Sequence, residues 1–141
     1  MAIDILTTFI AAIVATIIWF FIGAIVYMNP FVAKIYTHYE DDPTVKNRKN
    51  LKTFLINTFV FSIFIQSILF AFVYAYIQPI LPGTLYLNTL YFGIILILLK
   101  ILPRFFDMWV QSKYPTTLLF IEIINGAIGS FVMAFIFVFI I

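Results

Sequence analysis

Cysteine is absent from this chain of 141 residues, and charged residues make up only 10% of it. The lack of cysteine excludes a disulfide-stabilised secreted scaffold and any site built on thiolates. The net charge is only +2, which argues against a nucleic-acid-binding protein. A single histidine, His38, leaves little for catalysis that pairs histidine with a nucleophile, and we expect neither an enzyme nor a cofactor.

Apolar residues are correspondingly abundant, at 65% of the chain. Soluble domains contain about 45–50%, and a small domain cannot hide so large an excess from water. The composition therefore predicts an integral membrane protein.

Four long apolar segments divide the chain. They are continuous rather than alternating, which favours helices over the strands of a β-barrel. Each has about the 20 residues that a spanning helix needs. We predict an all-α, polytopic membrane protein that forms a single four-helix bundle over residues 1–141, with spans at residues 5–28, 54–77, 85–102 and 118–141.

The basic residues suggest how the chain is oriented. All eight lie in or beside two of the three connections, one between the first and second spans and the other between the third and fourth. By the positive-inside rule, four spans place both of these loops in the cytoplasm and both termini outside. We expect a multi-pass cell-membrane protein, most simply of a prokaryotic plasma membrane.

The first basic loop predicts how the second span begins. Asp42 followed by Pro43 is typical of a helix N-cap and first residue. Helix two would then start before the bilayer and carry its basic residues through the headgroup zone. Interface anchors are expected at the end of the first span, in this loop and in the second basic loop: Tyr27, Lys46, Arg48, Lys49 and Trp109. The basic cluster is a topology signal or a site for anionic lipid.

The second basic loop allows two interpretations. Residues 104–111 have the spacing of a short amphipathic helix lying in the interface, with Trp109 as its anchor. The alternative is an extension of helix three past a kink at Pro103.

Small and polar residues mark the faces on which the helices should pack. At 100° per residue, helix one gathers Thr8, Ala11, Ala12, Ala15, Trp19 and Gly23, and helix four gathers Glu122, Asn125, Gly126, Gly129 and Met133. Helix three gathers Tyr86, Thr89, Gly93 and Lys100, and helix two gathers Thr58, Ser62 and Gln66. Small residues let helices approach closely in a membrane, and polar ones bond between them.

Glu122 is the one carboxylate inside a span. A charge in lipid is costly, so we predict that Lys100 or Arg104 pairs with it and that Asn125 donates a further hydrogen bond. The pair would fix helix three against helix four. Glu122 could instead bind a proton or cation, or reach headgroup water.

Metal binding has one candidate, the loop segment containing His38, Glu40, Asp41 and Asp42. A lone histidine beside loop acids is usually solvated, and we predict no metal site.

Two segments resemble a known family. Residues 23–34, which contain Gly23, Tyr27 and Pro30, are similar to the first-helix exit of small four-span prokaryotic membrane proteins catalogued as domain of unknown function 1761, although Val26 replaces an aromatic residue. Residues 113–121 are similar to the family's basic-x-Pro entry into the last helix. The resemblance implies four helices and no known activity.

Two functions fit these features. The leading hypothesis is a non-enzymatic bundle that acts through membrane partners, as an accessory or structural subunit or as a homo-oligomer. The alternative is a small transporter or channel that uses Glu122 for proton or cation coupling, with Gln66, Lys100 and Asn125 lining its path.

Overall fold

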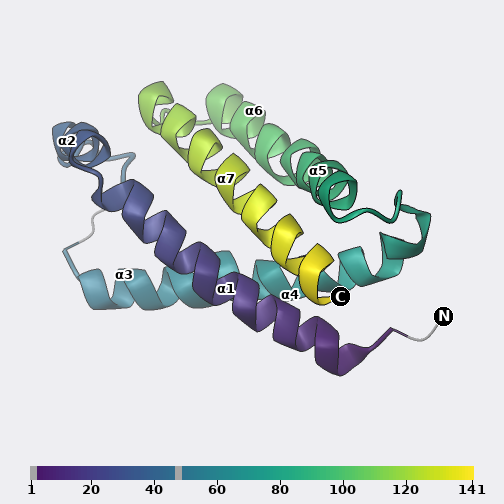
Figure 1. Cartoon of the computed structure of the whole chain (residues 1–141). Helices are drawn as coiled ribbons and strands as arrows, with labels where there is room; N and C mark the ends of the chain where they lie inside the picture. Colours follow the sequence, from purple (N-terminus) through teal and green to yellow (C-terminus); the bar gives the residue numbers. More distant parts are fainter. Residues whose placement is uncertain (1–2, 47–48) are drawn as a thin grey trace.

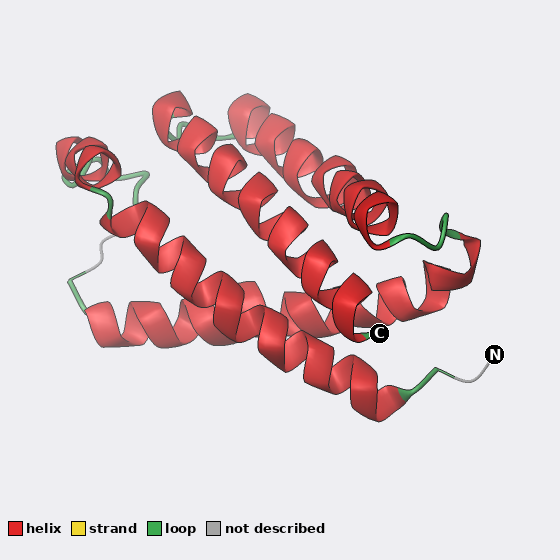
Figure 2. Cartoon of the chain, in the orientation of Figure 1, coloured by secondary structure: helices red, strands yellow, loops and turns green. Residues whose placement is uncertain are grey.

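A computed structural model describes residues 3–46 and 49–141. Helices joined by short loops account for nearly all of this part, which contains no strand (Figure 2). Four continuous helices are long and apolar enough to cross a membrane: Ile5–Met28, Leu51–Ile80, Leu85–Gln111 and Thr116–Ile140. The predicted all-α class and the four span-like helices are confirmed.

The second and third of these helices are built from several elements. The second comprises α3 (Leu51–Asn57), the π-helical segment η1 (Thr58–Phe64), α4 (Ile65–Ile77) and the 3-10 turn η2 (Gln78–Ile80). The third comprises α5 (Leu85–Leu96), the π-helical turn η3 (Ile97–Ile101) and α6 (Leu102–Gln111). The first is α1 (Ile5–Met28) and the fourth is α7 (Thr116–Ile140), with the short helix α2 (Pro30–His38) between α1 and α3.

Helix α2 lies where the sequence predicted only a loop. Its N-cap is Asn29, whose side-chain oxygen accepts a hydrogen bond from the Phe31 amide at 2.9 Å, and Pro30 is its first residue. An Asn-Pro pair at this position is a standard helix start, so the signal was present in the sequence.

The predicted start of helix two near Pro43 is wrong. Asp42 caps a turn instead, accepting a hydrogen bond from the Thr44 amide at 2.8 Å. The helix begins at Leu51, and Asn50 is its N-cap, accepting from the Thr53 amide at 3.2 Å. Asp42 and Asn50 each accept a hydrogen bond from a backbone amide that would otherwise lack a partner. Both residue types favour turns and helix starts, but only Asn50 leads into a helix here.

Helix three continues without a break to Gln111, nine residues beyond its predicted end at residue 102. The extension is therefore observed, rather than a separate interfacial helix. The turn η3 inserts one extra residue, so that the buried residues Leu96 and Ile101 stay on one face although they are five positions apart.

Helix α7 lies between α1 and α5 and contacts both extensively, while the second long helix crosses α1 and passes behind it in the view of Figure 1. Aromatic rings fill the centre. Tyr74 of α4 and Phe92 of α5 meet edge to face at 5.0 Å between centroids, and both contact Phe137 of α7. All three are fully buried.

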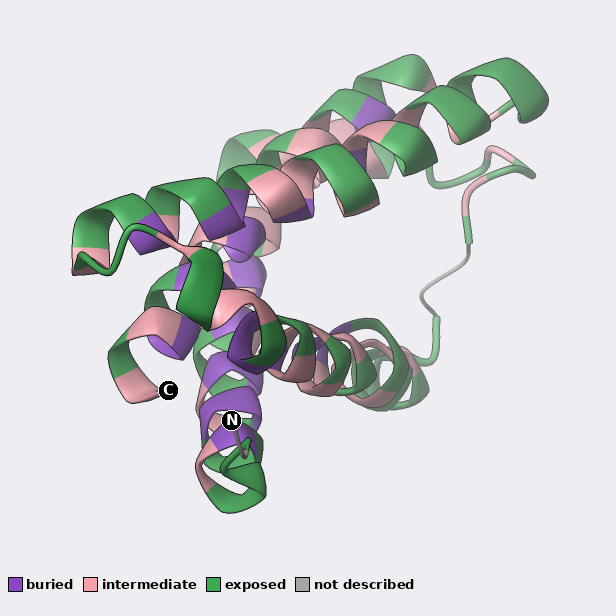
Figure 3. Cartoon of the chain, turned by 90° about the vertical axis from the view of Figure 1, so that its right-hand side faces the viewer, coloured by how far each residue is buried: buried purple, intermediate pink, exposed green. Residues whose placement is uncertain are grey.

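Burial divides the molecule into two halves. The first described residues and Ile141 lie toward one end, and buried positions concentrate there, whereas α3 and α6 contain none (Figure 3). The opposite end holds both basic loops, which meet where the Thr44 hydroxyl donates to the Lys113 carbonyl at 3.5 Å. The two loops thus share an end, as the four-span topology requires. The side of the membrane that this end faces stays a prediction.

Candidate functional site

Glu122 lies in the second turn of α7, at the end that carries the basic loops. Its Oε2 accepts a hydrogen bond from Arg104 Nη2 of α6 at 3.2 Å, and the two form an ion pair. Its Oε1 accepts one from the Tyr114 hydroxyl at 2.7 Å. The Glu122 side chain is 24% exposed and that of Arg104 is 66% exposed, so the pair lies at the rim of the bundle. We call Glu122, Arg104, Tyr114, Asn125 and Tyr27 the Glu122 cluster.

Tyr114 occupies the short extended loop between α6 and α7, and no pattern in the sequence singled it out. Ser112 holds the loop by donating to the Met108 carbonyl and accepting from the Tyr114 amide. Burial raises the pKa of the Tyr114 hydroxyl, and its hydrogen bond to the Glu122 carboxylate raises it further. The hydroxyl therefore stays protonated and acts as a donor.

Asn125 does not donate to Glu122 as predicted. Its Nδ2 donates to the hydroxyl of Tyr27, at the end of α1, at 3.4 Å. Three residues along a helix leave the two side chains about 60° apart, so Asn125 can meet Tyr27 of α1 while Glu122 meets Arg104 of α6. Tyr27, predicted as an interface anchor, also packs edge to face against Tyr36 of α2 at 5.6 Å between centroids. The cluster thereby joins α1, α2, α6 and α7.

Lys100 lies outside the cluster. Its Nζ is 5.6 Å from the centroid of the Phe70 ring of α4, a cation–π contact, whereas Arg104 takes the partner role at Glu122. The turn η3 explains the difference: Ile101 occupies the face that regular helical spacing would give to Lys100. At the other end of the predicted face of helix three, Tyr86 is 83% exposed, whereas Gly93 in its middle is buried and lies against Phe131 of α7.

Gln66, the remaining candidate for a polar path, belongs to α4. Its side-chain Oε1 is buried and has no hydrogen-bond partner among the described residues, and the same is true of Asn125 Oδ1. The structure shows no hydrogen bond or ion pair within the described chain that joins Gln66 to Lys100, Glu122 or Asn125.

Three of the four candidate packing glycines receive large side chains rather than a neighbouring backbone. A Cβ at Gly129 would lie 2.4 Å from the Trp19 ring, one at Gly93 2.4 Å from Phe131, and one at Gly126 2.5 Å from Ile101. Gly23 does not fit the prediction, since a Cβ there would have no neighbour within 4 Å. Ala12 and Ala15 are buried on α1 together with Trp19.

The predicted interface anchors other than Tyr27 lie on α6 and in the first basic loop. Trp109 is 56% exposed on α6, and Lys46 and Lys49 are exposed in the first basic loop. Arg48 lies outside the described residues. The ring of His38 packs against Tyr39, and no group of three or more potential metal ligands occurs in the part of the chain that the structure describes.

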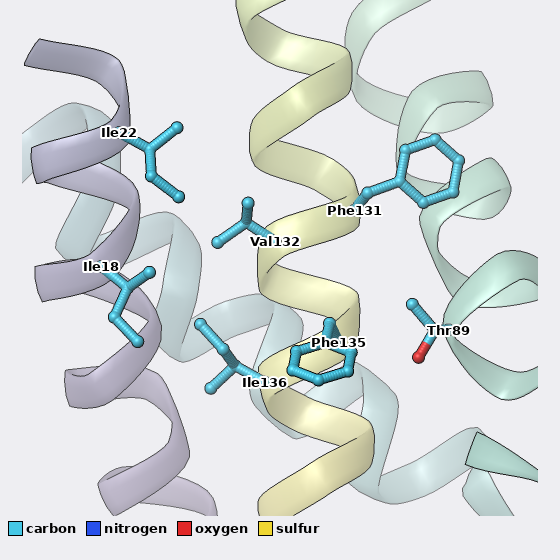
Figure 4. A pocket seen from close by; sticks show the side chains of 7 residues that line it. All are labelled: Ile18, Ile22, Thr89, Phe131, Val132, Phe135 and Ile136. Carbon is cyan, nitrogen blue, oxygen red and sulfur yellow. The ribbon is translucent and has the colours of Figure 1, made fainter. Parts of the chain in front are cut away.

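A mostly apolar groove of about 460 Å³ lies on another side of the bundle, between α1, α5 and α7 (Figure 4). Ile18 and Ile22 form one wall, and Phe131 and Ile136 are among the α7 residues opposite. Thr89 supplies the one polar side chain of its lining, and its hydroxyl is buried without a described hydrogen-bond partner. Apart from this hydroxyl, the described residues that line the groove offer no polar or titratable side chain.

Comparison with known proteins gives one match. The model of a family described as protein of unknown function (DUF1761) matches residues 10–138. No curated protein and no solved structure matches the chain. Two segments of the matched range, residues 23–34 and 113–121, supply Tyr27 and Tyr114, which the fold brings to the same cluster.

Proposed function

The chain belongs to the DUF1761 family, and from its geometry we propose that it is a non-enzymatic subunit of a membrane assembly, either a homo-oligomer or a larger complex. The observation that carries this proposal is the state of Glu122. Both oxygens of its carboxylate are occupied, one by Arg104 and the other by Tyr114. The polar side chains around Glu122 therefore hold α6, the following loop and α7 together.

The contacts of the cluster support a fastening role. Arg104 joins α6 to α7, Tyr114 joins the intervening loop to α7, and Asn125 joins α7 to Tyr27 of α1. Helix association in membranes depends on packing and on such polar bonds, because lipid supplies no hydrophobic drive between helices. A fixed arrangement of helices is what a structural subunit offers to its partners.

The outer surface supports partners within the bilayer. Large apolar side chains are exposed on all four long helices, including Phe21, Phe61, Tyr91 and Phe139. Lipid covers part of this surface, and aromatic side chains also suit helix contacts. The distribution of the basic residues supports loops that face the cytoplasm. The resemblance to small four-span prokaryotic proteins supports a prokaryotic plasma membrane.

A transporter that couples through Glu122 has less support. A coupling carboxylate must bind and release its proton or cation along a water-reachable path. Glu122 is instead neutralised by Arg104, and Lys100 is directed to Phe70.

Charge removal and charge exchange at Glu122 test the proposal. We expect Glu122→Gln and Arg104→Gln each to destabilise the purified protein by about 1 kcal/mol, since the pair is partly exposed. Both should weaken assembly in mild detergent, as measured by light scattering after gel filtration. The double exchange E122R/R104E should recover part of both losses.

Asp107→Asn is the matched control. Asp107 accepts a hydrogen bond from Gln111 Nε2 within the same helix at 2.6 Å, so its substitution should leave assembly unchanged. Ion flux in proteoliposomes is measured in parallel. Loss of a coupled flux in Glu122→Gln with assembly intact would support the transporter instead. A wild-type protein that purifies as a lone monomer, without partners, would overturn the subunit role.

A further inference from the structure

A second hollow, of about 630 Å³, lies along the second long helix at the end that carries the basic loops. We call it the span-two hollow. Its polar lining comes from the first basic loop, from α3 and from η1: Lys46, Asn50, Thr53, Asn57, Thr58 and Ser62. Phe54 and Phe61 complete it. We propose that the span-two hollow binds one anionic phospholipid of the surrounding leaflet.

The order of its lining residues follows the order of groups in a phospholipid. Lys46 lies in the loop, where the phosphate of the headgroup would be. Asn50, Thr53 and Asn57 follow along the helix and offer amides and hydroxyls at the depth of the glycerol and ester groups. Phe61, deeper in the span and 65% exposed, would lie beside an acyl chain. Lipid-binding pockets of membrane proteins combine basic residues with apolar walls in this way.

The end of the second long helix that carries the hollow has little cover from the rest of the described chain. Helix α3 contains no buried residue and packs chiefly against η1, which itself packs on α1. Asn57 and Ser62 are therefore exposed within a helix of membrane-spanning length. Polar groups facing hydrocarbon are costly, and a lipid that brings its own polar groups to them removes that cost.

Charge selects the kind of lipid. None of the described residues that line the hollow is acidic, and Lys46 is exposed at its loop end. A lysine near the surface favours an anionic headgroup over a zwitterionic one. A second copy of the chain suits the hollow less well, since a two-fold contact through it would bring two Lys46 side chains toward each other.

The test uses the full chain purified in neutral detergent and examined by native mass spectrometry. Phosphatidylglycerol and phosphatidylcholine with identical acyl chains are added in turn. We expect the wild type to retain phosphatidylglycerol preferentially. Lys46→Gln should reduce that preference about fivefold, the effect of one lysine near a membrane surface. Asn57→Leu should lower retention of both lipids, because it removes a contact to the glycerol region.

Lys34→Gln is the matched control, because Lys34 lies on α2 and does not line the hollow. It should leave the preference unchanged. Thermal unfolding of each variant without lipid checks that it is folded, and Ser62→Ala provides a second reading if Asn57→Leu is not. Glycerol phosphate is added as a soluble competitor and should displace little of the bound lipid.

Four results would overturn the proposal. They are equal retention of both lipids by the wild type, equal effects of the Lys46 and Lys34 variants, and displacement of the lipid by glycerol phosphate. The fourth is a lipid-free dimer that Asn57→Leu dissociates, which would assign the hollow to a second copy.

Discussion

The two halves of this molecule are held together by different means. Toward the end where Ile141 lies, the helices are joined by buried rings and by large side chains set against small residues, as in the contact of Tyr74, Phe92 and Phe137. Toward the basic loops, α2, α3 and α6 contain no buried residue, and an ion pair and hydrogen bonds around Glu122 add to the apolar contacts of Leu118 and Leu119 at the start of α7. The long helices are similarly apolar, yet their packed ends hold the protein together while their ends near the basic loops leave polar side chains exposed.

Removing a ring from each half gives the largest expected contrast. Phe92 is fully buried and Phe61 is 65% exposed. We expect Phe92→Ala to lower the free energy of unfolding by about 3 kcal/mol, at the lower end of the range for such changes. The value is low because, in a membrane, the side chain leaves the core for apolar lipid and not for water, so that only packing is lost. Phe61→Ala should change it by less than about 0.5 kcal/mol. Unfolding in mixed detergent micelles measures both, and similar losses would contradict the division into halves.

A pair of glycine substitutions refines the contrast inside the packed half. A Cβ at Gly129 would meet the Trp19 ring at 2.4 Å, and the rigid indole would have to shift. We expect Gly129→Ala to destabilise the protein by about 1–3 kcal/mol. Gly23→Ala is its control: the added methyl meets nothing, and the higher helix propensity of alanine should stabilise by up to about 1 kcal/mol. Thermal unfolding compares them, and losses of equal size would contradict packing by insertion.

The smallest effect concerns the polar half, and the contribution behind it is lost at alkaline pH. The Tyr114 hydroxyl has a pKa raised above its ordinary value of 10.0 by burial and by the bond to Glu122. The folded state therefore holds this proton more tightly than the unfolded state, so the contribution is complete below about pH 10 and is lost as the pH rises toward the folded pKa.

Tyr114→Phe should remove that alkaline dependence and lower the stability at neutral pH by about 1 kcal/mol, the value of one hydrogen bond. Tyr86→Phe, at an exposed position, serves as the control and should leave the profile intact. Unfolding measured between pH 8 and pH 11 tests this, and a wild-type profile in Tyr114→Phe would remove the phenol from the cluster.

The sequence predicted the long helices and the packing face of the first one correctly. The six residues that regular spacing placed on one face of helix one are all buried, because α1 is an uninterrupted α-helix: Thr8, Ala11, Ala12, Ala15, Trp19 and Gly23. Gly23 is buried without making the close contact expected of it. Composition and a constant angle per residue are sufficient information for such a helix.

The same projection failed for Lys100 of helix three for a physical reason. It assumes 100° per residue, whereas η3 winds more slowly and moves Lys100 off the face that Leu96 and Ile101 share. Arg104, and not Lys100, then reaches Glu122. Tyr114 was missed because its role depends on the path of an extended loop of four residues. Such a path produces no periodic pattern in the sequence. Asn88, which accepts a hydrogen bond from the Gly83 amide at 3.0 Å, was missed for a similar reason.

The wider turn at η3 changes which residues of the third helix lie on the face that contacts α7. In a helix of uniform pitch, Lys100, four positions after Leu96, would share the face of Leu96. Here Ile101 stays against α7 at Gly126, while Lys100, the next residue back, points across to α4. The additional residue thus keeps Ile101 in the contact with α7 and leaves the ammonium group of Lys100 between the second and third long helices.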